Sequence, residues 1–148
     1  MHPTNPDILL AGTGNNAYPE GGGVYLATNG GTSWQAVLSN ENYNAIEFAL
    51  SNPNIAYAGS ASAVYRSSDR GQTWRKVSVG TEGWGSPGVR AGFPIDFQAD
   101  PRDPNRVFAN NYGGGNFLSV DGGVYRLDFN GEPPEPASIQ ESIVEGEL

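Results

Sequence analysis

The chain has 148 residues, of which 37% are hydrophobic and 16% charged, so one domain with a buried core is predicted. It contains no cysteine, which excludes a disulfide framework, a thiolate zinc site and a cysteine nucleophile. The net charge of −8 disfavours binding to nucleic acid or anionic lipid, and no apolar run is long enough to span a membrane.

Glycine and proline punctuate the whole chain, with 21 and 11 residues. They show no period of three, which favours a turn-rich all-β protein over collagen or long helices. An Asx-Pro-Asx turn followed by a short apolar strand occurs three times, around Pro6, Pro53 and Pro104. Repeats 47 and 51 residues apart predict an array of small sheets.

A second feature follows each of these turns and is most complete in residues 64–74. Residues 64–67 alternate apolar and polar, as a half-buried strand does, and Trp74 opens another alternating run. Between them Asp69 can accept backbone N–H bonds, and Gly71 can adopt a positive φ at no steric cost. Two strands joined by a tight turn are therefore predicted, with the Trp74 ring buried beneath the turn.

The other two copies depart from this pattern. In residues 24–34, Ala27 and Asn29 replace the Ser and the Asp, and both changes are mild. Residues 119–123 keep the Ser, the Asp and the Gly, but Tyr125 and Arg126 stand where Thr and Trp are expected. The missing tryptophan weakens the third unit.

The pattern Ser-x-Asp-x-Gly-x-Thr-Trp in residues 67–74 resembles the Asp-box, or BNR repeat. This repeat is found in sialidases, sortilin-type receptors, xyloglucan-active glycoside hydrolases and a photosystem II assembly factor. The resemblance implies a β-propeller, whose blades are four-stranded antiparallel sheets. In that family the box is a fold signature away from the active site, so the resemblance leaves the activity open. The family is often secreted or extracytoplasmic, whereas residues 1–3 do not read as the start of a signal peptide.

Strands are expected at residues 44–50, 55–60, 64–67 and 73–79 in the second unit, and at 93–99, 107–110, 117–120 and 124–129 in the third. Within the first of these, Ile46, Phe48 and Leu50 should share one face. Only Met1 and His2 precede the first turn, so the first unit lacks its first strand. The expectation is an all-β propeller-type array of three blades at about 1–40, 41–80 and 92–131, forming a fragment of a larger propeller that associates with further blades or with itself.

Residues 132–148 form an acidic, proline-rich tail with five glutamates. The prolines forbid a continued strand, and a capping box at Ser138 permits a short helix, so a mobile tail or one helical turn is expected. In the alternative, the tail supplies the missing strand of the first blade.

Residues 14–23, 80–92 and 110–116 are expected to be irregular loops, where binding residues concentrate. Candidate ligand-binding residues are Tyr18, Trp84, Arg90 and Tyr112. Aromatic rings on glycine-rich loops suit stacking on a sugar or anchoring a peptide. In the alternative, Trp84 and Tyr112 fold back as loop anchors.

Asp96 is the candidate catalytic residue, because residues 92–98 resemble the inner strand that carries an acid in xyloglucan-active hydrolases. Glycoside hydrolysis needs two carboxylates, and no second acid can be assigned. Asp96 can equally face a water-filled channel. The single histidine, His2, lies at a terminus expected to be frayed, and the eight basic residues are scattered, so no metal, cofactor or sialidase-like site is predicted.

Two functions remain open. The first is a non-catalytic binding or structural module that presents loops to a protein or a glycan. The second is a fragment of a glycoside hydrolase of the xyloglucanase or sialidase type. The missing second carboxylate favours the first.

Overall fold

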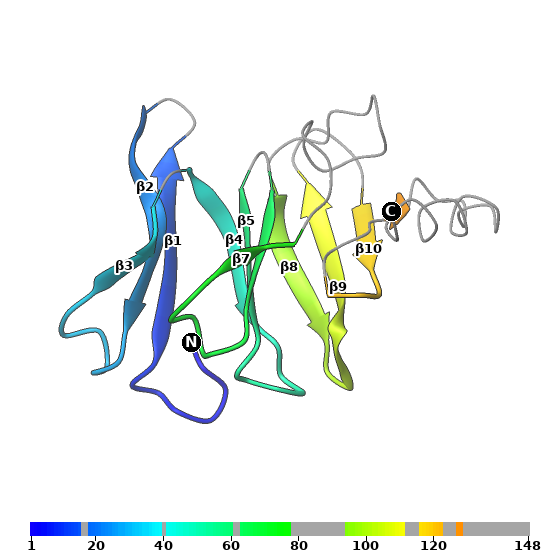
Figure 1. Ribbon diagram of the computed structural model, residues 1–148, viewed down its shortest axis with the longest axis horizontal. Helices are drawn as coiled ribbons and strands as arrows, with labels where there is room; N and C mark the ends of the chain where they lie inside the picture. Colours follow the sequence, from blue (N-terminus) through cyan, green and yellow to red (C-terminus); the bar gives the residue numbers. More distant parts are fainter. Residues whose placement is uncertain are drawn as a thin grey trace.

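The computed structural model describes residues 1–15, 18–39, 41–60, 63–77, 94–111, 116–122 and 127–128. These residues form three antiparallel sheets that stand side by side (Figure 1). The first blade has β1 (Leu9–Asn15), β2 (Tyr18–Ala27) and β3 (Gln35–Leu38). The second has β4 (Tyr43–Phe48), β5 (Ala56–Ser60), β6 (Val64–Ser67) and β7 (Arg75–Lys76). The third has β8 (Pro94–Asp100), β9 (Asp103–Asn111), β10 (Asn116–Ser119) and β11 (Leu127–Asp128).

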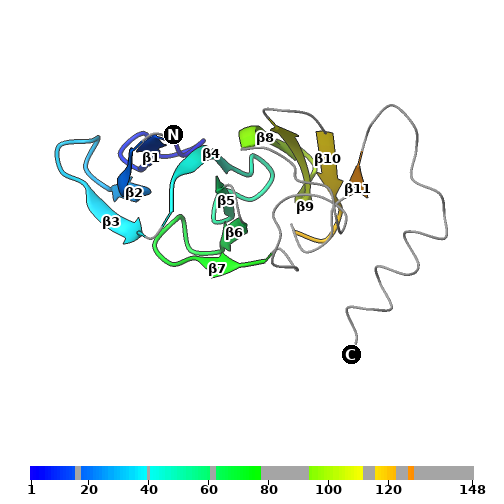
Figure 2. The same cartoon turned by 90° about the horizontal axis from the view of Figure 1, so that it is seen from above.

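Strand order within each sheet follows the chain, so the blades are simple meanders. Seen from above, β1, β4 and β8 lie along one side of the row, and β3 and β7 lie along the other (Figure 2). The all-β expectation and the three-strand first blade are confirmed for the described residues.

Each Asx-Pro-Asx turn is closed by its first side chain, which accepts a hydrogen bond from the backbone two residues later. The three bonds are Asp7 N to Asn5 Oδ1 (3.0 Å), Asn54 N to Asn52 Oδ1 (3.3 Å) and Asn105 N to Asp103 Oδ1 (2.9 Å). The backbone carbonyl of the third residue of each turn accepts a hydrogen bond from the N–H of the fourth residue of the box, which is Arg70 in the complete box. These bonds are Gly30 to Asp7 (3.0 Å), Arg70 to Asn54 (2.9 Å) and Gly122 to Asn105 (2.8 Å). The two recurring sequence features are therefore one hydrogen-bonded unit in every blade.

The complete box, residues 67–74, is held together by hydrogen bonds between its own residues. The Asp69 carboxylate accepts the Thr73 N–H (2.9 Å) and hydroxyl (2.5 Å), and it also accepts the Ser67 hydroxyl (2.8 Å). Gly71, at φ 85°, donates its N–H to the Ser67 Oγ (2.8 Å), and its carbonyl accepts the Trp74 ring N–H (3.0 Å). Every polar group of the motif has a structural partner, which agrees with a fold signature.

The variant boxes keep parts of this arrangement. In the first blade, Asn29 Oδ1 accepts the Ser33 N–H (3.1 Å), and its amide donates to the Ser33 hydroxyl (2.8 Å). In the third blade, the Ser119 hydroxyl donates to Asp121 at 2.8 Å, as in the complete box. Trp34 departs from the expected burial, because 45% of it is exposed on the outer side of the first blade.

The predicted loop at residues 14–23 is wrong. β1 continues to Asn15 and β2 begins at Tyr18, so most of that stretch is a hairpin. The glycines that suggested a loop instead permit close packing, since a Cβ on Gly22 would lie 2.6 Å from the Glu41 carbonyl oxygen. Leu50 also departs from expectation, because β4 ends at Phe48 and Leu50 is 57% exposed.

The expectation of a frayed His2 is also wrong. Its backbone N–H donates to the Ile8 carbonyl (2.9 Å), and its ring packs edge-on against Phe48 at 5.1 Å. The imidazole is buried, and burial together with the charge of Arg70 lowers its pKa. His2 is therefore a neutral core residue that joins the first turn to the second blade.

The apolar core lies between the blades, so the second sheet, which has a neighbour on each side, is buried on both faces. Every residue of β5 is buried. One cluster joins the second and third blades, and two join the first and second. No helix in the described part of the chain is long and apolar enough to cross a membrane.

Candidate functional site

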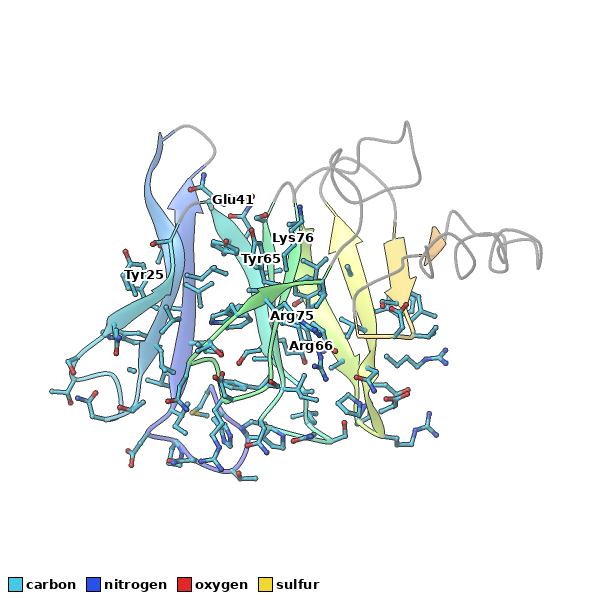
Figure 3. The ribbon with its side chains drawn as sticks, viewed as in Figure 1. Tyr25, Glu41, Tyr65, Arg66, Arg75 and Lys76 are labelled. Carbon is cyan, nitrogen blue, oxygen red and sulfur yellow. The ribbon has the colours of Figure 1, made fainter. Side chains whose placement is uncertain are left out.

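A group of cationic side chains lies at the outer edge of the second blade. Arg66 on β6 is directly opposite Arg75 on β7, and Lys76 follows on β7 (Figure 3). Like charges facing across two strands destabilise a sheet, by about 0.2–1 kcal/mol. Arg70, in the box turn of the same blade, instead donates its Nε–H to Asn54 Oδ1 (2.9 Å). The strand pairing therefore brings three of the eight basic residues, which the sequence analysis described as scattered, to one edge.

Arg66 is held in place by the third blade. Its Nε donates to the Tyr57 hydroxyl (3.3 Å) and its Nη2 to Asn105 Oδ1 (3.2 Å). Arg75 and Lys76 are exposed, and ion pairs in the described part of the chain involve other bases. Arg66 and Arg75 point to one face of the edge and Lys76 points to the other, because successive side chains of a strand alternate. The two guanidiniums on the first face can accept a carboxylate or a phosphate.

The opposite face of the second blade, which packs against the first blade, carries a contact between two of its own aromatic rings. Tyr65, which pairs with Lys76, donates its hydroxyl to Glu41 Oε1 (3.2 Å). The rings of Tyr43 and Tyr65 meet edge-on at 5.6 Å. Burial raises the pKa of Tyr43 above its ordinary value, with the neighbouring Tyr65 as a further cause. The Tyr43 phenol is thus neutral near pH 7. Tyr25 stands in the first blade at the position equivalent to Tyr65 and is partly exposed.

Asp96, the candidate catalytic residue, lies exposed on β8 and has an acidic neighbour that the sequence did not reveal. Glu47 on β4 accepts the Ala99 N–H at Oε2 (3.0 Å). Burial raises the pKa of Glu47, and the charge of Asp96 raises it further, while the Ala99 bond opposes both. A carboxyl whose pKa is raised by burial and by a second carboxylate is one element of an acid–base pair.

A sequence signal for Glu47 existed but was weak. It is the single charged residue of β4, in the position that Gln98 occupies in the third blade. Nothing in the spacing of Glu47 and Asp96 along the chain links them, since they meet only when β4 packs beside β8.

The other predicted site residues are not brought together in the described structure. Tyr18 begins β2 opposite Asn15, and only its backbone is described. Trp84, Arg90 and Tyr112 lie outside the described residues. No group of three or more metal-ligating side chains occurs within the described ranges.

No protein-family model matches the sequence, and no curated protein sequence matches it either. Solved structures do match. An ancestral GH74 enzyme superposes with a TM-score of 0.67 at 23% identity, over 93% of this chain and 18% of its own. YCF48 from Cyanidioschyzon merolae matches with a TM-score of 0.57 at 18% identity, over 95% of this chain and 42% of its own. A structure of YCF48 bound to D1 peptide matches with a TM-score of 0.58 at 19% identity, over 88% of this chain and 43% of its own.

Both kinds of relative are Asp-box β-propeller proteins. The fold of this chain is therefore that of consecutive Asp-box propeller blades, and it spans less than half of each protein it resembles.

Proposed function

We propose that this chain is a non-catalytic binding module that takes an acidic segment of a protein along the edge of its second blade, with Arg66 and Arg75 on one face of that edge and Lys76 on the other. The observation that carries the proposal is the facing pair of Arg66 and Arg75. Two cations held opposite each other cost stability unless an anion lies between them. A ligand carboxylate would relieve that repulsion, so binding and local stability would rise together.

Charge balance supports an anionic ligand at this particular edge. The protein carries a net charge of −8, so a polyanion is repelled from most of the surface. Arg66 and Arg75 supply two positive charges at this edge, where the third blade supplies the carboxylates of Asp103 and Asp121 near the Tyr57 hydroxyl. The structure of YCF48 with D1 peptide is consistent with a peptide as the class of ligand.

The test is fluorescence anisotropy with a labelled peptide of alternating Glu and Gly. The parent should bind it, and binding should weaken as salt rises because exposed charges are screened. Arg75→Gln combined with Lys76→Gln should weaken binding roughly tenfold, since each exposed charge contact contributes up to about 1 kcal/mol.

Two comparisons control for net charge alone. Arg102→Gln with Arg106→Gln removes the same charge from residues that pair with Asp100, and it should leave the affinity nearly unchanged. A peptide of alternating Gln and Gly should not bind. Equal affinity for the two peptides, or equal losses in the two double variants, would refute the proposal.

Four further ligand contacts, on protein or glycan, are proposed at Tyr18, which begins β2, and at Trp84, Arg90 and Tyr112. Aromatic and guanidinium side chains supply much of the binding energy in many interfaces. Alanine at any one of them should weaken ligand binding without changing the melting temperature by more than a few degrees.

A second candidate function, a fragment of a glycoside hydrolase, is favoured by one observation. Glu47 and Asp96 lie on neighbouring inner strands, and burial together with the charge of Asp96 raises the pKa of Glu47. Release of reducing ends from xyloglucan by the parent, lost in Glu47→Gln and in Asp96→Asn, would establish it. A parent without activity that still binds the acidic peptide favours the binding module.

A further inference from the structure

The box of the first blade differs from the complete box at the position of the aspartate. Asn29 stands where the complete box has Asp69, and Gly30 follows it where the complete box has Arg70. Both Asn29 and Gly30 are exposed, in the turn between β2 and β3. Asparagine is a chemically labile residue. It is most labile before glycine, because glycine has no side chain to hinder attack by its backbone nitrogen.

Asn29 makes the same contacts as the aspartate whose place it takes. Its Oδ1 accepts the Ser33 N–H (3.1 Å), and its Nδ2 donates to the Ser33 hydroxyl (2.8 Å). In the complete box, one carboxylate oxygen of Asp69 accepts the Thr73 N–H (2.9 Å) and the other accepts the Thr73 hydroxyl (2.5 Å). A hydroxyl can both donate and accept, so the Ser33 side chain can bond to an aspartate at position 29 as well as to the asparagine.

We propose that Asn29 is a deamidation site and that its aspartate product completes the box of the first blade. The Gly30 backbone nitrogen attacks the side-chain carbonyl carbon of Asn29 and forms a C–N bond. The bond from that carbon to Nδ2 breaks, and Nδ2 leaves as ammonia with the proton that Gly30 loses. Water then opens the cyclic imide. If water breaks the newly formed bond, an aspartate remains in the normal backbone. If it breaks the original peptide bond, an isoaspartate remains, whose backbone is one carbon longer.

Both reacting groups have other partners in the folded turn. Gly30, at φ 67°, donates its N–H to the Asp7 carbonyl (3.0 Å), while the Asn29 amide is bonded to Ser33. Attack therefore requires a transient opening of the turn. Exposed turns open locally at a much lower free energy than the whole fold. The rate at Asn29 should thus depend on how firmly Ser33 holds the amide.

The aspartate product brings both a gain and a cost in stability. Hydrogen bonds to a carboxylate are about twice as strong as those to a neutral amide, which favours the product. The cost comes from charge, because the third residue of the turn and the third residue of the box include one acid in every blade. The pairs are Asp7 with Asn29, Asn54 with Asp69, and Asn105 with Asp121.

Deamidation would place a second carboxylate in the first of these pairs. Asp7 lies close by, since its Oδ1 would be 3.6 Å from a Cβ on Gly30. Asp7 is exposed, however, so solvent and salt screen the repulsion between the two carboxylates. The stronger bonds to Ser33 should therefore outweigh the repulsion. An isoaspartate has no such gain, because its longer backbone displaces Gly30 from the Asp7 carbonyl.

The experiment is peptide mapping by mass spectrometry on the full chain, kept folded at mildly alkaline pH. Asn29 should gain the mass that replaces an amide by an acid. Ser33→Ala removes the hydroxyl that holds the amide, and it should speed deamidation at Asn29 roughly fivefold, as expected for one lost hydrogen bond. Thr73→Ala is the matched control, because it removes the equivalent hydroxyl from the second box and should leave that rate unchanged. Asn130, which also precedes a glycine, is the internal reference and should react at one rate in all three proteins.

A second measurement tests the product. Asn29→Asp should melt a few degrees above the parent at neutral pH and should lose this advantage in acid, when its carboxyl is protonated. Adding Asp7→Asn restores one acid to the pair and should raise the melting temperature further. Asn29→Ala, which removes both bonds to Ser33, should melt below the parent.

Three results would overturn the proposal. The first is a folded parent in which Asn130 deamidates and Asn29 does not. The second is a rate at Asn29 that is the same in Ser33→Ala as in the parent. The third is an Asn29→Asp change that lowers the melting temperature even in the Asp7→Asn background, which would show that an aspartate does not complete this box.

Discussion

The hydroxyl of Tyr57 in the second blade donates a hydrogen bond of 2.6 Å to the backbone carbonyl of Pro104 in the third. The same oxygen accepts the Arg66 Nε–H at 3.3 Å, so it serves both as donor and as acceptor. Burial raises the pKa of Tyr57, although Arg66 opposes this, so the phenol stays neutral. One atom therefore connects the two blades and orients a guanidinium of the candidate site.

Replacing Tyr57 by Phe should lower the free energy of unfolding by about 1–3 kcal/mol, because the buried Pro104 carbonyl loses its donor. Urea unfolding followed by tryptophan fluorescence measures it, and the slope with denaturant should not change. Tyr25→Phe is the control, since the Tyr25 hydroxyl has no hydrogen bond to any described residue, and it should stay within about 0.5 kcal/mol of the parent. Similar losses in both variants would contradict the assignment.

Asp69→Ala should lower the free energy of unfolding by about 1–3 kcal/mol, because the Thr73 N–H and the hydroxyls of Ser67 and Thr73 lose their acceptor. Its effect on ligand binding should be no larger than its effect on stability. A variant that melts like the parent but binds nothing would show that the box is a site.

Asp69 should also make stability depend on acid pH. Burial acts to raise its pKa, but the bonds from Thr73 and Ser67 outweigh burial and the pKa lies below its ordinary value. A carboxyl with a lowered pKa in the folded state stabilises above its unfolded pKa of about 3.9, and this is lost as pH falls through the folded pKa. Unfolding curves from neutral pH to pH 3 should therefore fall less steeply below about pH 4 for Asp69→Asn than for the parent.

The two tryptophans of the boxes should differ in their contribution to stability. Trp74→Ala should cost about 3 kcal/mol, because the ring packs between two blades and bonds to the Gly71 carbonyl. Trp34→Ala should cost about 1 kcal/mol in the monomer, since 45% of the residue is exposed. Thermal melts at low protein concentration measure both without a contribution from association. Equal costs would mean that Trp34 is packed as Trp74 is.

Glu47→Gln should be neutral or stabilising at pH 7. The folded state raises the pKa of Glu47, chiefly by burial, so the native protein binds the proton more tightly than the unfolded chain. Stability then falls as pH rises from the ordinary Glu pKa of about 4.3 through the folded value. Gln keeps an oxygen for the Ala99 N–H, carries no charge and should flatten this part of the pH profile. Loss of stability at pH 7 would indicate that the charge of Glu47 is itself required.

The blade pattern could be predicted from the sequence because its determinants are local. The Asp69 bonds reach no further than four residues, and the Asn52 side chain closes its own turn. Such bonds depend on residue type and spacing alone, so the Asx-Pro-Asx turns and the boxes located the strands of every blade. They did so even where the third box had lost its tryptophan.

Contacts between blades could not be predicted in this way, because they join residues whose separation along the chain has no period. Glu47 meets Asp96 only when β4 packs beside β8. Gly22 lies in β2, where the sequence suggested a loop. This position requires glycine because the backbone of Glu41, which follows β3, approaches too closely for any side chain. The burial of His2 against Phe48 likewise depends on how the sheets stack. The repeat thus determined each sheet, while the packing of one sheet on the next decided which of its polar and aromatic residues are buried, paired or exposed to a ligand.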